Sequence, residues 1–339
     1  MSGITSKRQS IVFGNQPRIA AWASVAGKKE SEGPLLNEFD IVNIDTTFGE
    51  KTWEQAEKRM QQMALKKLEE KAGRKGKPFD LVLSGDLLNQ CIGSSFTLRN
   101  TGIPHLGLYG ACSTMAESLL LGAMIVNAGY FESAVAMTSS HFAASERQYR
   151  FPLGYGGQRP PTAQWTVTGA GAALLQKSGN GPRITSGTIG TVTDLGISDA
   201  NNMGAAMAPA ALATIKAHFH DFECSPEDFD LIATGDLGQT GKELLLSLAR
   251  LEGINLGGKL TDCGTLVYDN TAQDVHSGGS GCGCSAITLC GYLLNRIRSG
   301  KLKRILFCGT GALLSPTSTQ QGLPIPGVCH AVCIEGGNG

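Results

Sequence analysis

A cysteine in the stretch "YGACSTMAE" at 109–117 has the setting of a nucleophile. Cys112 follows an extended segment and two small residues, and a long apolar run with helical spacing begins directly after it. A thiol at a helix N-terminus feels the aligned peptide dipoles, which favour the reactive thiolate. The motif therefore indicates a working nucleophile, the remnant of one, or a small residue needed at a packed turn.

A duplicated strand motif is the first sign of the framework that must position this cysteine. The segment "FDLVLSGDLLNQ" at 79–90 recurs as "FDLIATGDLGQT" at 229–240, and six of the twelve positions are identical. Each copy is a short apolar run closed by Gly-Asp, which is typical of a buried parallel strand ending in a tight turn.

The sequence around each copy is also similar. An amphipathic helix is predicted before each strand, and the first begins with a capping box from Thr52 to Gln55. Cys-Ser opens a helix downstream in both copies, at 112–113 and 284–285, and a β-rich run follows. We therefore predict two similar α/β halves with parallel sheets, spanning 1–180 and 181–339. The segment 142–165 is rich in Gly, Pro and Arg and is predicted to be a long ordered loop.

Composition excludes several classes of protein. The chain has 339 residues, and its 29 Lys and Arg balance 29 Asp and Glu, so no overall field attracts nucleic acid or anionic lipid. The ten cysteines are too sparse for a secreted disulfide scaffold. We expect no signal peptide, because the start "MSGITSKRQSIVF" has no sustained apolar region, and we expect no membrane span, because the longest apolar stretch is short and interrupted. We expect a soluble protein of a reducing compartment that reaches a membrane only through a partner.

Three motifs in order resemble the thiolase fold, whose superfamily includes thiolases and ketoacyl synthases. They are "GACSTMAES" around Cys112, "TVTGAGAALL" at 166–175 and "SGGSGCGCSA" at 277–286. The resemblance implies an α/β fold in which two duplicated βαβ halves form α-β-α-β-α layers. It also implies a homodimer.

A more specific set of motifs is similar to the stage V sporulation protein AD family of spore-forming bacteria. It includes "GDLLNQ", "ERQYRFP", "YGGQRP", "MGAAMAPAA", "GGSGCGCSA" and "GTGALLSPTSTQQ". This resemblance implies a soluble component of the spore's dipicolinic acid channel, the SpoVA channel, that binds pyridine-2,6-dicarboxylate, alone or as its calcium complex. The implied partners are integral-membrane and soluble proteins of that channel, at the forespore or spore inner membrane.

The catalytic groups of the thiolase superfamily are not all present. The turn matching the synthase histidine reads "ATGDLGQT" at 233–240, and the glycine loop at 277–286 holds neither His nor Asn. Condensing chemistry needs a base and donors for the developing oxyanion. We therefore expect a binding protein without cofactor in which Cys112 is a relic, and the alternative is an acyltransferase that uses Cys112.

A flat dicarboxylate requires cationic or amide donors and a sheltered surface for its ring. Arg147 and Arg150 supply cations, although they also suit contacts that only anchor the segment. His141 follows a predicted strand end, and ligands of open parallel sheets bind at such ends. The predicted ligand-binding set is completed by Cys112, Asp86, Asn89, Gly279 and Ser280. Asp86 has a structural role in its turn as the alternative. The glycine loop either presents backbone N–H groups to an anion or only allows close packing. No protein metal site is predicted, because the six histidines are scattered and Cys282 and Cys284 lack a second pair.

Overall fold

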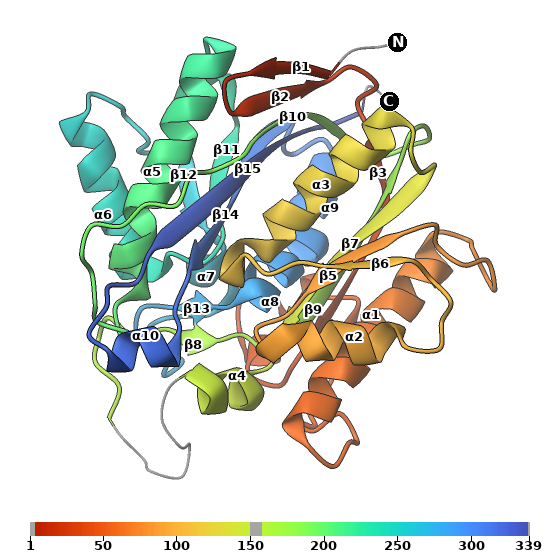
Figure 1. Cartoon of the computed structure of the whole chain (residues 1–339), viewed down its shortest axis with the longest axis horizontal. Helices are drawn as coiled ribbons and strands as arrows, with labels where there is room; N and C mark the ends of the chain where they lie inside the picture. The colour runs from red at the N-terminus through yellow and green to blue at the C-terminus, as the bar shows by residue number, and fades with distance from the viewer. Residues whose placement is uncertain (1–3, 150–157, 338–339) are drawn as a thin grey trace.

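The computed structural model describes residues 4–149 and 158–337. Its main sheet contains the same five-strand arrangement twice (Figure 1). In the first half the order is β3-β9-β7-β5-β6, and in the second half it is β10-β15-β14-β11-β12. The strands of the first half are β3 (Arg18–Ala26), β9 (Gly169–Gln176), β7 (Ser133–Ser140), β5 (Val82–Gly85) and β6 (His105–Gly107). Those of the second are β10 (Arg183–Thr188), β15 (Gly327–Glu335), β14 (Arg304–Ala312), β11 (Leu231–Thr234) and β12 (Leu260–Asp262).

The two halves of the sheet meet where β3 pairs with β10, at Arg18 and Arg183. Five short strands lie outside the repeated order. They are β1 (Ile4–Lys7), β2 (Ser10–Phe13), β4 (Ile41–Val42), and the pair β8 (Trp165–Thr166) and β13 (Gly279–Ser280), which forms a separate small sheet. The duplication predicted from the repeated strand motif is therefore present as a repeated topology.

Helices fill three layers around and between the two half-sheets (Figure 1). The outer layer of the first half holds α1 (Trp53–Lys71), with α2 (Ile92–Leu98) beside it. The central layer holds α3 (Thr114–Ala128), α8 (Cys282–Ile287) and α9 (Leu294–Arg298), the last two joined by a π-helical turn, Thr288–Leu293. The outer layer of the second half holds α5 (Met203–Phe222) and α6 (Gly238–Leu251). Shorter helices are α4 (Phe142–Tyr149), α7 (Cys263–Val267) and α10 (Pro316–Gln320).

Alternation along the central strands explains the layering. Ile305 and Phe307 of β14 face the central helices, whereas Leu306 and Cys308 face α5 and α6. Because successive side chains of a strand point to opposite faces, a strand buried on both sides reads as a continuous apolar run. The apolar runs in the sequence are therefore strands covered by helices on both faces, as the α-β-α-β-α prediction requires.

Two details differ from the sequence-based prediction. The sheets are mixed and not parallel, because β9 and β15 run antiparallel to their neighbours. The chain before each of these strands stays at the carboxyl edge of the sheet, in α4 or α10, and a parallel strand would need a crossover back to the other edge. The predicted loop 142–165 is also wrong in part, since it begins with the helix α4. His141 precedes this helix, and Ala143 to Glu146 are buried by it.

One helix window, 111–128, is apolar and long enough to cross a membrane, but 72% of it is buried within the protein. This window contains α3, which packs between the two half-sheets. It is the central core helix of the fold.

Candidate functional site: a buried thiol and an adjacent pocket

Cys112 lies in a single 3₁₀ turn, Ala111–Ser113, that leads directly into α3. Ala111 has a φ of 49°, a left-handed conformation that is strained for a residue with a side chain. The Ser113 hydroxyl donates to the Gly110 carbonyl at 2.6 Å, which fastens the turn. The sequence therefore builds a sharp elbow before the helix, and the predicted position of the cysteine at the helix start is correct.

The Cys112 thiol is nevertheless closed in. Only 6% of the residue is exposed, and it packs in a small cluster with Leu87, Tyr149 and Cys282. Burial raises the pKa of Cys112 well above its ordinary value, and the neighbouring carboxylate of Asp236 raises it further. The expectation that the helix dipole favours a thiolate is thus outweighed, because burial and a nearby negative charge both favour the protonated thiol.

Asp236 is the residue that the sequence reasoning missed. It follows β11, is fully buried, and its charge raises the pKa of the neighbouring Cys112 thiol. Its hydrogen-bond donors come from two places: the Thr310 hydroxyl of β14 at 2.9 Å, and the glycine loop, through the Gly281 N–H at 2.8 Å and the Ser280 hydroxyl at 3.4 Å. Burial raises the pKa of Asp236 to about 6, against the effect of these hydrogen bonds. The signal was present, because this aspartate stands in the turn that matches the synthase histidine.

The glycine loop approaches Asp236 because it lacks side chains. Gly281 has a φ of 98°, and a Cβ there would lie 2.6 Å from the Ser140 hydroxyl oxygen. The amide of Gln164 holds the two segments together by donating to the Asp236 carbonyl at 2.7 Å and the Gly279 carbonyl at 2.8 Å. The structure thus brings three predicted residues, Cys112, Gly279 and Ser280, to one place.

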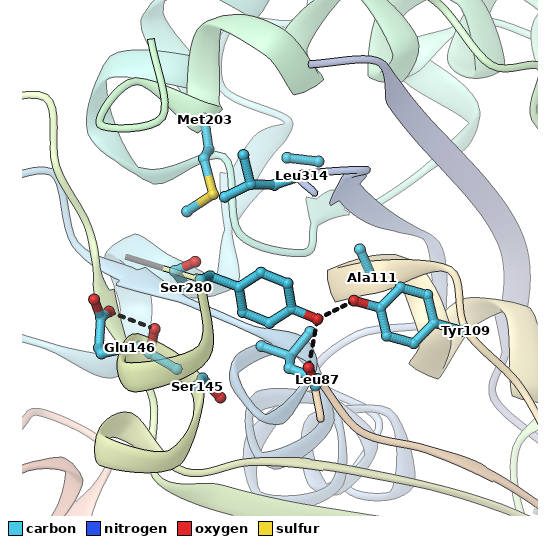
Figure 2. A pocket seen from close by; sticks show the side chains of 11 residues that line it. Leu87, Tyr109, Ala111, Ser145, Glu146, Met203, Ser280 and Leu314 are labelled. Atoms are coloured by element: carbon cyan, nitrogen blue, oxygen red, sulfur yellow. Dashed lines mark hydrogen bonds between the residues drawn. The ribbon is translucent and has the colours of Figure 1, made fainter. Parts of the chain in front are cut away.

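A pocket opens beside this cluster, with an empty volume of about 410 Å³ that includes open solvent (Figure 2). Its wall is mainly apolar and aromatic, and hydroxyls and one carboxylate supply the polar groups: Leu87, Tyr109, Ala111, Ser145, Glu146, Tyr149, Thr166, Met203, Ser280, Ala312 and Leu314. The Tyr109 and Tyr149 hydroxyls are hydrogen-bonded to each other, and Tyr149 also donates to the Leu87 carbonyl. Burial raises the pKa of Tyr149 to about 12, so both tyrosines are neutral near neutral pH.

Two polar residues of the wall, Ser145 and Glu146, come from α4 (Figure 2). The Ser145 hydroxyl is buried and makes no hydrogen bond within the described part of the chain. Glu146 accepts from the Thr166 hydroxyl at 2.9 Å. Among the described residues that line the pocket there is no lysine or arginine, so its electrostatic character is neutral to acidic.

The other predicted ligand-binding residues lie elsewhere. Asp86 is turned inward, where it accepts from the Ser94 N–H and hydroxyl, both at 2.7 Å, and does not point to the cleft as expected. The repeated Gly-Asp turn wraps around the N-terminal end of α2 here, which supplies closer donors than the cleft does. The ring Nε2 of His141 donates to the Thr46 carbonyl at 2.8 Å, and burial lowers its pKa.

Arg147 and Asn89 belong to the surface around α4. Arg147 pairs with Glu54 and stacks over Trp53, with 53% of its side chain exposed. Asn89 is exposed and is bound by Gln148 through both its N–H and its side-chain oxygen. Arg150 lies outside the described residues. No group of three or more His, Cys, Asp or Glu side chains that could hold a metal ion occurs within the described residues.

The fold and the elbow cysteine define a protein of the thiolase-like class. A 3-oxoacyl-[acyl-carrier-protein] synthase III from Aquifex aeolicus VF5 matches with a TM-score of 0.56 and 14% identity, covering 94% of this chain and 99% of that one. An OleA variant from Xanthomonas campestris matches with a TM-score of 0.60 and 15% identity, covering 96% and 99%. At such identities the likeness establishes the fold alone.

Sequence comparison resolves the class further. The profile of the family described as Stage V sporulation protein AD matches residues 7–335. The Stage V sporulation protein AD of Bacillus subtilis (strain 168) is 42% identical over 332 residues, which is 98% of each chain. The chain therefore belongs to the stage V sporulation protein AD family, as the motifs at the sequence level indicated.

Proposed function

We propose that this chain is a non-catalytic binding protein for dipicolinic acid and a soluble component of the channel that moves it into the developing spore. The observation that carries the non-catalytic part is the burial of the Cys112 thiol beside the Asp236 carboxylate, which together hold the pKa of Cys112 well above its ordinary value. The dipicolinic acid part rests on the family resemblance, and the pocket beside Cys112 is the place that suits it.

The geometry around Asp236 opposes catalysis by Cys112. For a thiol to act as a nucleophile, a neighbouring base must be free to accept its proton. Both carboxylate oxygens of Asp236 already accept from Thr310, Gly281 or Ser280, and its negative charge disfavours the thiolate. Leu87 and Tyr149 also cover the thiol on its pocket side. The scaffold keeps a cavity beside a thiol that is held protonated.

The pocket suits a flat aromatic ligand that carries little net charge. Tyr109, Tyr149 and Leu314 offer apolar surface to a ring, and the Ser145 hydroxyl is a hydrogen-bond donor that a carboxylate oxygen can use. A bare dianion would lie beside the Glu146 carboxylate without a cation in the described wall, which is unfavourable. We therefore propose the neutral calcium complex as the preferred ligand.

Calorimetric titration with dipicolinate, with and without Ca²⁺, tests this proposal, and isophthalate, which lacks the ring nitrogen, is the control ligand. We expect saturable binding that Ca²⁺ strengthens and that isophthalate does not reproduce. Ser145→Ala should weaken it by about tenfold, the effect of one hydrogen bond to a charged group. Ser247→Ala, on exposed α6, is the matched control. Equal binding of isophthalate, or no binding by folded protein, would refute the ligand assignment.

The alternative acyltransferase makes a separate prediction about Cys112. Incubation with an acyl-coenzyme A thioester, followed by mass spectrometry of the intact protein, should show no acyl adduct on this residue. A stable adduct that Cys112→Ala removes would instead establish a working nucleophile, whatever the outcome of the ligand titration.

We further propose a homodimer formed through the edge strand β6, with the channel's membrane proteins as additional partners at the spore inner membrane. Leu106 of β6 is 49% exposed on an unpaired edge, and Phe96 and Tyr109 expose apolar surface nearby in the chain. Exposed edges favour pairing with another chain. Sedimentation of Leu106→Asp should show monomers, and Leu251→Asp, at a residue 84% exposed on the other half, should leave the dimer intact. A monomeric wild-type protein would refute this part.

A further inference from the structure

The outer face of α1 concentrates positive charge in a chain whose total is neutral. Residues 51–77 hold nine lysines and arginines against four glutamates, a net charge of +5. One of those glutamates, Glu57, is fully buried and does not reach this surface. The helix lies in the outer layer of the first half (Figure 1), and Arg59, Lys66 and Lys71 on it are exposed. Such a local field acts on partners even when the whole chain has no net charge.

Five of these cations make no ion pair within the described residues. Lys51, Arg59, Lys66, Lys75 and Lys77 are exposed and unpaired, whereas Lys67 pairs with Glu70 at 3.4 Å. Lys58 and Lys71 likewise pair, with Glu50 and Asp40. Glu69 is occupied by the Gly76 N–H at 2.6 Å. The free cations therefore outnumber the remaining acidic groups of the face.

A shallow groove runs along the same face and has an apolar part. Ile41 of β4 and Met63 of α1 lie in its wall with Arg59, Lys66 and Lys67 around them, and Gln62 and Glu70 complete it. Arg59 and Lys66 are seven positions apart, which places them two turns apart on one side of the helix. Basic side chains on long flexible stems, spread around a half-buried apolar strip, are typical of a surface that adsorbs to lipid.

We propose that this face of α1, with the 74–77 loop, adsorbs to an anionic phospholipid surface. The cations contact lipid phosphates, and Met63 and Ile41 approach the headgroup layer without inserting a helix. A membrane fits better than an acidic protein segment, because the cations are dispersed over a helix and a loop and do not converge on one point. This binding is independent of the pocket beside Cys112.

Vesicle flotation tests the proposal. The full chain should float with vesicles of phosphatidylcholine mixed with phosphatidylglycerol, much less with phosphatidylcholine alone, and less again at raised salt, which screens surface charge. The quadruple variant Arg59→Glu, Lys66→Glu, Lys75→Glu, Lys77→Glu should lower the partition at least about tenfold, since each basic residue near an anionic surface contributes to binding. The matched control reverses four basic residues elsewhere: Lys177, Lys216, Lys242 and Arg250, each to Glu.

Several outcomes would overturn it. These are equal flotation with both kinds of vesicle, an equal loss in the control variant, or full displacement from vesicles by inorganic phosphate, which would indicate a small-anion site. Tighter binding to polyglutamate than to the vesicles would favour an acidic protein partner instead. The dipicolinate titration of the quadruple variant should match the wild type, so that failure here and failure of the pocket proposal can be distinguished.

Discussion

The two Gly-Asp turns of this protein have the same sequence and different roles. Gly85-Asp86 and Gly235-Asp236 each follow a buried strand, β5 or β11, at corresponding places in the repeated sheet. Both glycines are needed for close approach, since a Cβ would lie 2.2 Å from the Leu108 carbonyl oxygen at Gly85 and 2.9 Å from the Thr310 N at Gly235. The backbone of the turn is therefore fixed by packing in both halves.

The two carboxylates differ in which parts of the chain they connect by hydrogen bonds. The Asp86 carboxylate accepts local hydrogen bonds, from Leu88 and Ser94, which lie within eight positions of it in the sequence. Asp236 joins distant elements, because its donors come from β14 and from the glycine loop before α8, and its charge also acts on the Cys112 thiol of the other half. Duplication supplied one turn twice, and only the second copy faces the junction between the halves where the thiol lies.

The largest effect that this comparison predicts is on stability. Asp236→Ala leaves the buried donors of β14 and of the glycine loop without an acceptor, and we expect it to lower the free energy of unfolding by about 3–5 kcal/mol. Asp86→Ala should cost less, roughly 1–3 kcal/mol, because it also removes a negative charge beside the buried Glu57. Urea denaturation of both variants measures the difference. Equal losses would show that the two turns are equivalent after all.

A pH series would sharpen the same comparison. The pKa of Asp236 is raised from 3.8 to about 6 by burial, so the folded state binds more protons than the unfolded state in this window. The protonated Asp236 therefore makes its full contribution to the free energy of unfolding below pH 3.8, and this contribution is lost as the pH rises through 6. The loss amounts to about 3 kcal/mol at most for a shift of this size.

Other buried acids with raised pKa values, such as Asp262 at about 7, also make the folded state less stable as the pH rises. The test therefore compares the variant with the wild type at each pH. Unfolding of wild type and Asp236→Asn should be followed between pH 4 and pH 7. We expect the stability deficit of the variant to shrink as the pH rises, because it lacks the titrating group. A deficit that stays constant or grows would show that Asp236 is ionised throughout this range.

Cysteine reactivity gives a third contrast between the turns. Asp236 raises the pKa of Cys112, whereas Asp86 raises the pKa of Cys91. Asp236→Asn should therefore speed alkylation of Cys112 by iodoacetamide by about tenfold, the effect of one pKa unit. Asp86→Asn should speed that of Cys91 and leave Cys112 unchanged. Peptide mass spectrometry after timed quenching reports both sites, and the reverse pattern would contradict the assignment of partners.

Much of the fold could be predicted from the sequence. The periodicity and the capping box located α1, where Thr52 accepts from the Gln55 N–H at 3.3 Å, and the repeat predicted the duplicated sheet. Such features are local, because periodicity and turn chemistry are written within a few residues. The antiparallel strands β9 and β15 were missed because strand direction depends on where a connection lies, which no local pattern encodes.

The candidate site was predictable only in part, for the same reason. Cys112, Gly279 and Ser280 carry recognisable motifs, and the structure brings them together. Tyr109 stands three positions before Cys112 and lines the pocket, although only the fold shows that it faces Tyr149. The arginine of α4 was chosen for its charge, but the direction of a helical side chain depends on packing, which turns Arg147 to Glu54 and Trp53.

Arg147 therefore gives the smallest predicted effect. Its ion pair with Glu54 is more than half exposed on the arginine side, and exposed pairs contribute about 0–1 kcal/mol because water screens them and their side chains lose freedom. Arg147→Ala should change the free energy of unfolding by less than about 1 kcal/mol. It should also leave dipicolinate affinity within about twofold, far from the tenfold loss expected for Ser145→Ala. If calorimetry instead shows that Arg147→Ala abolishes binding, the side chain must leave Glu54 when ligand enters, and α4 would be a moving wall of the pocket rather than a fixed one.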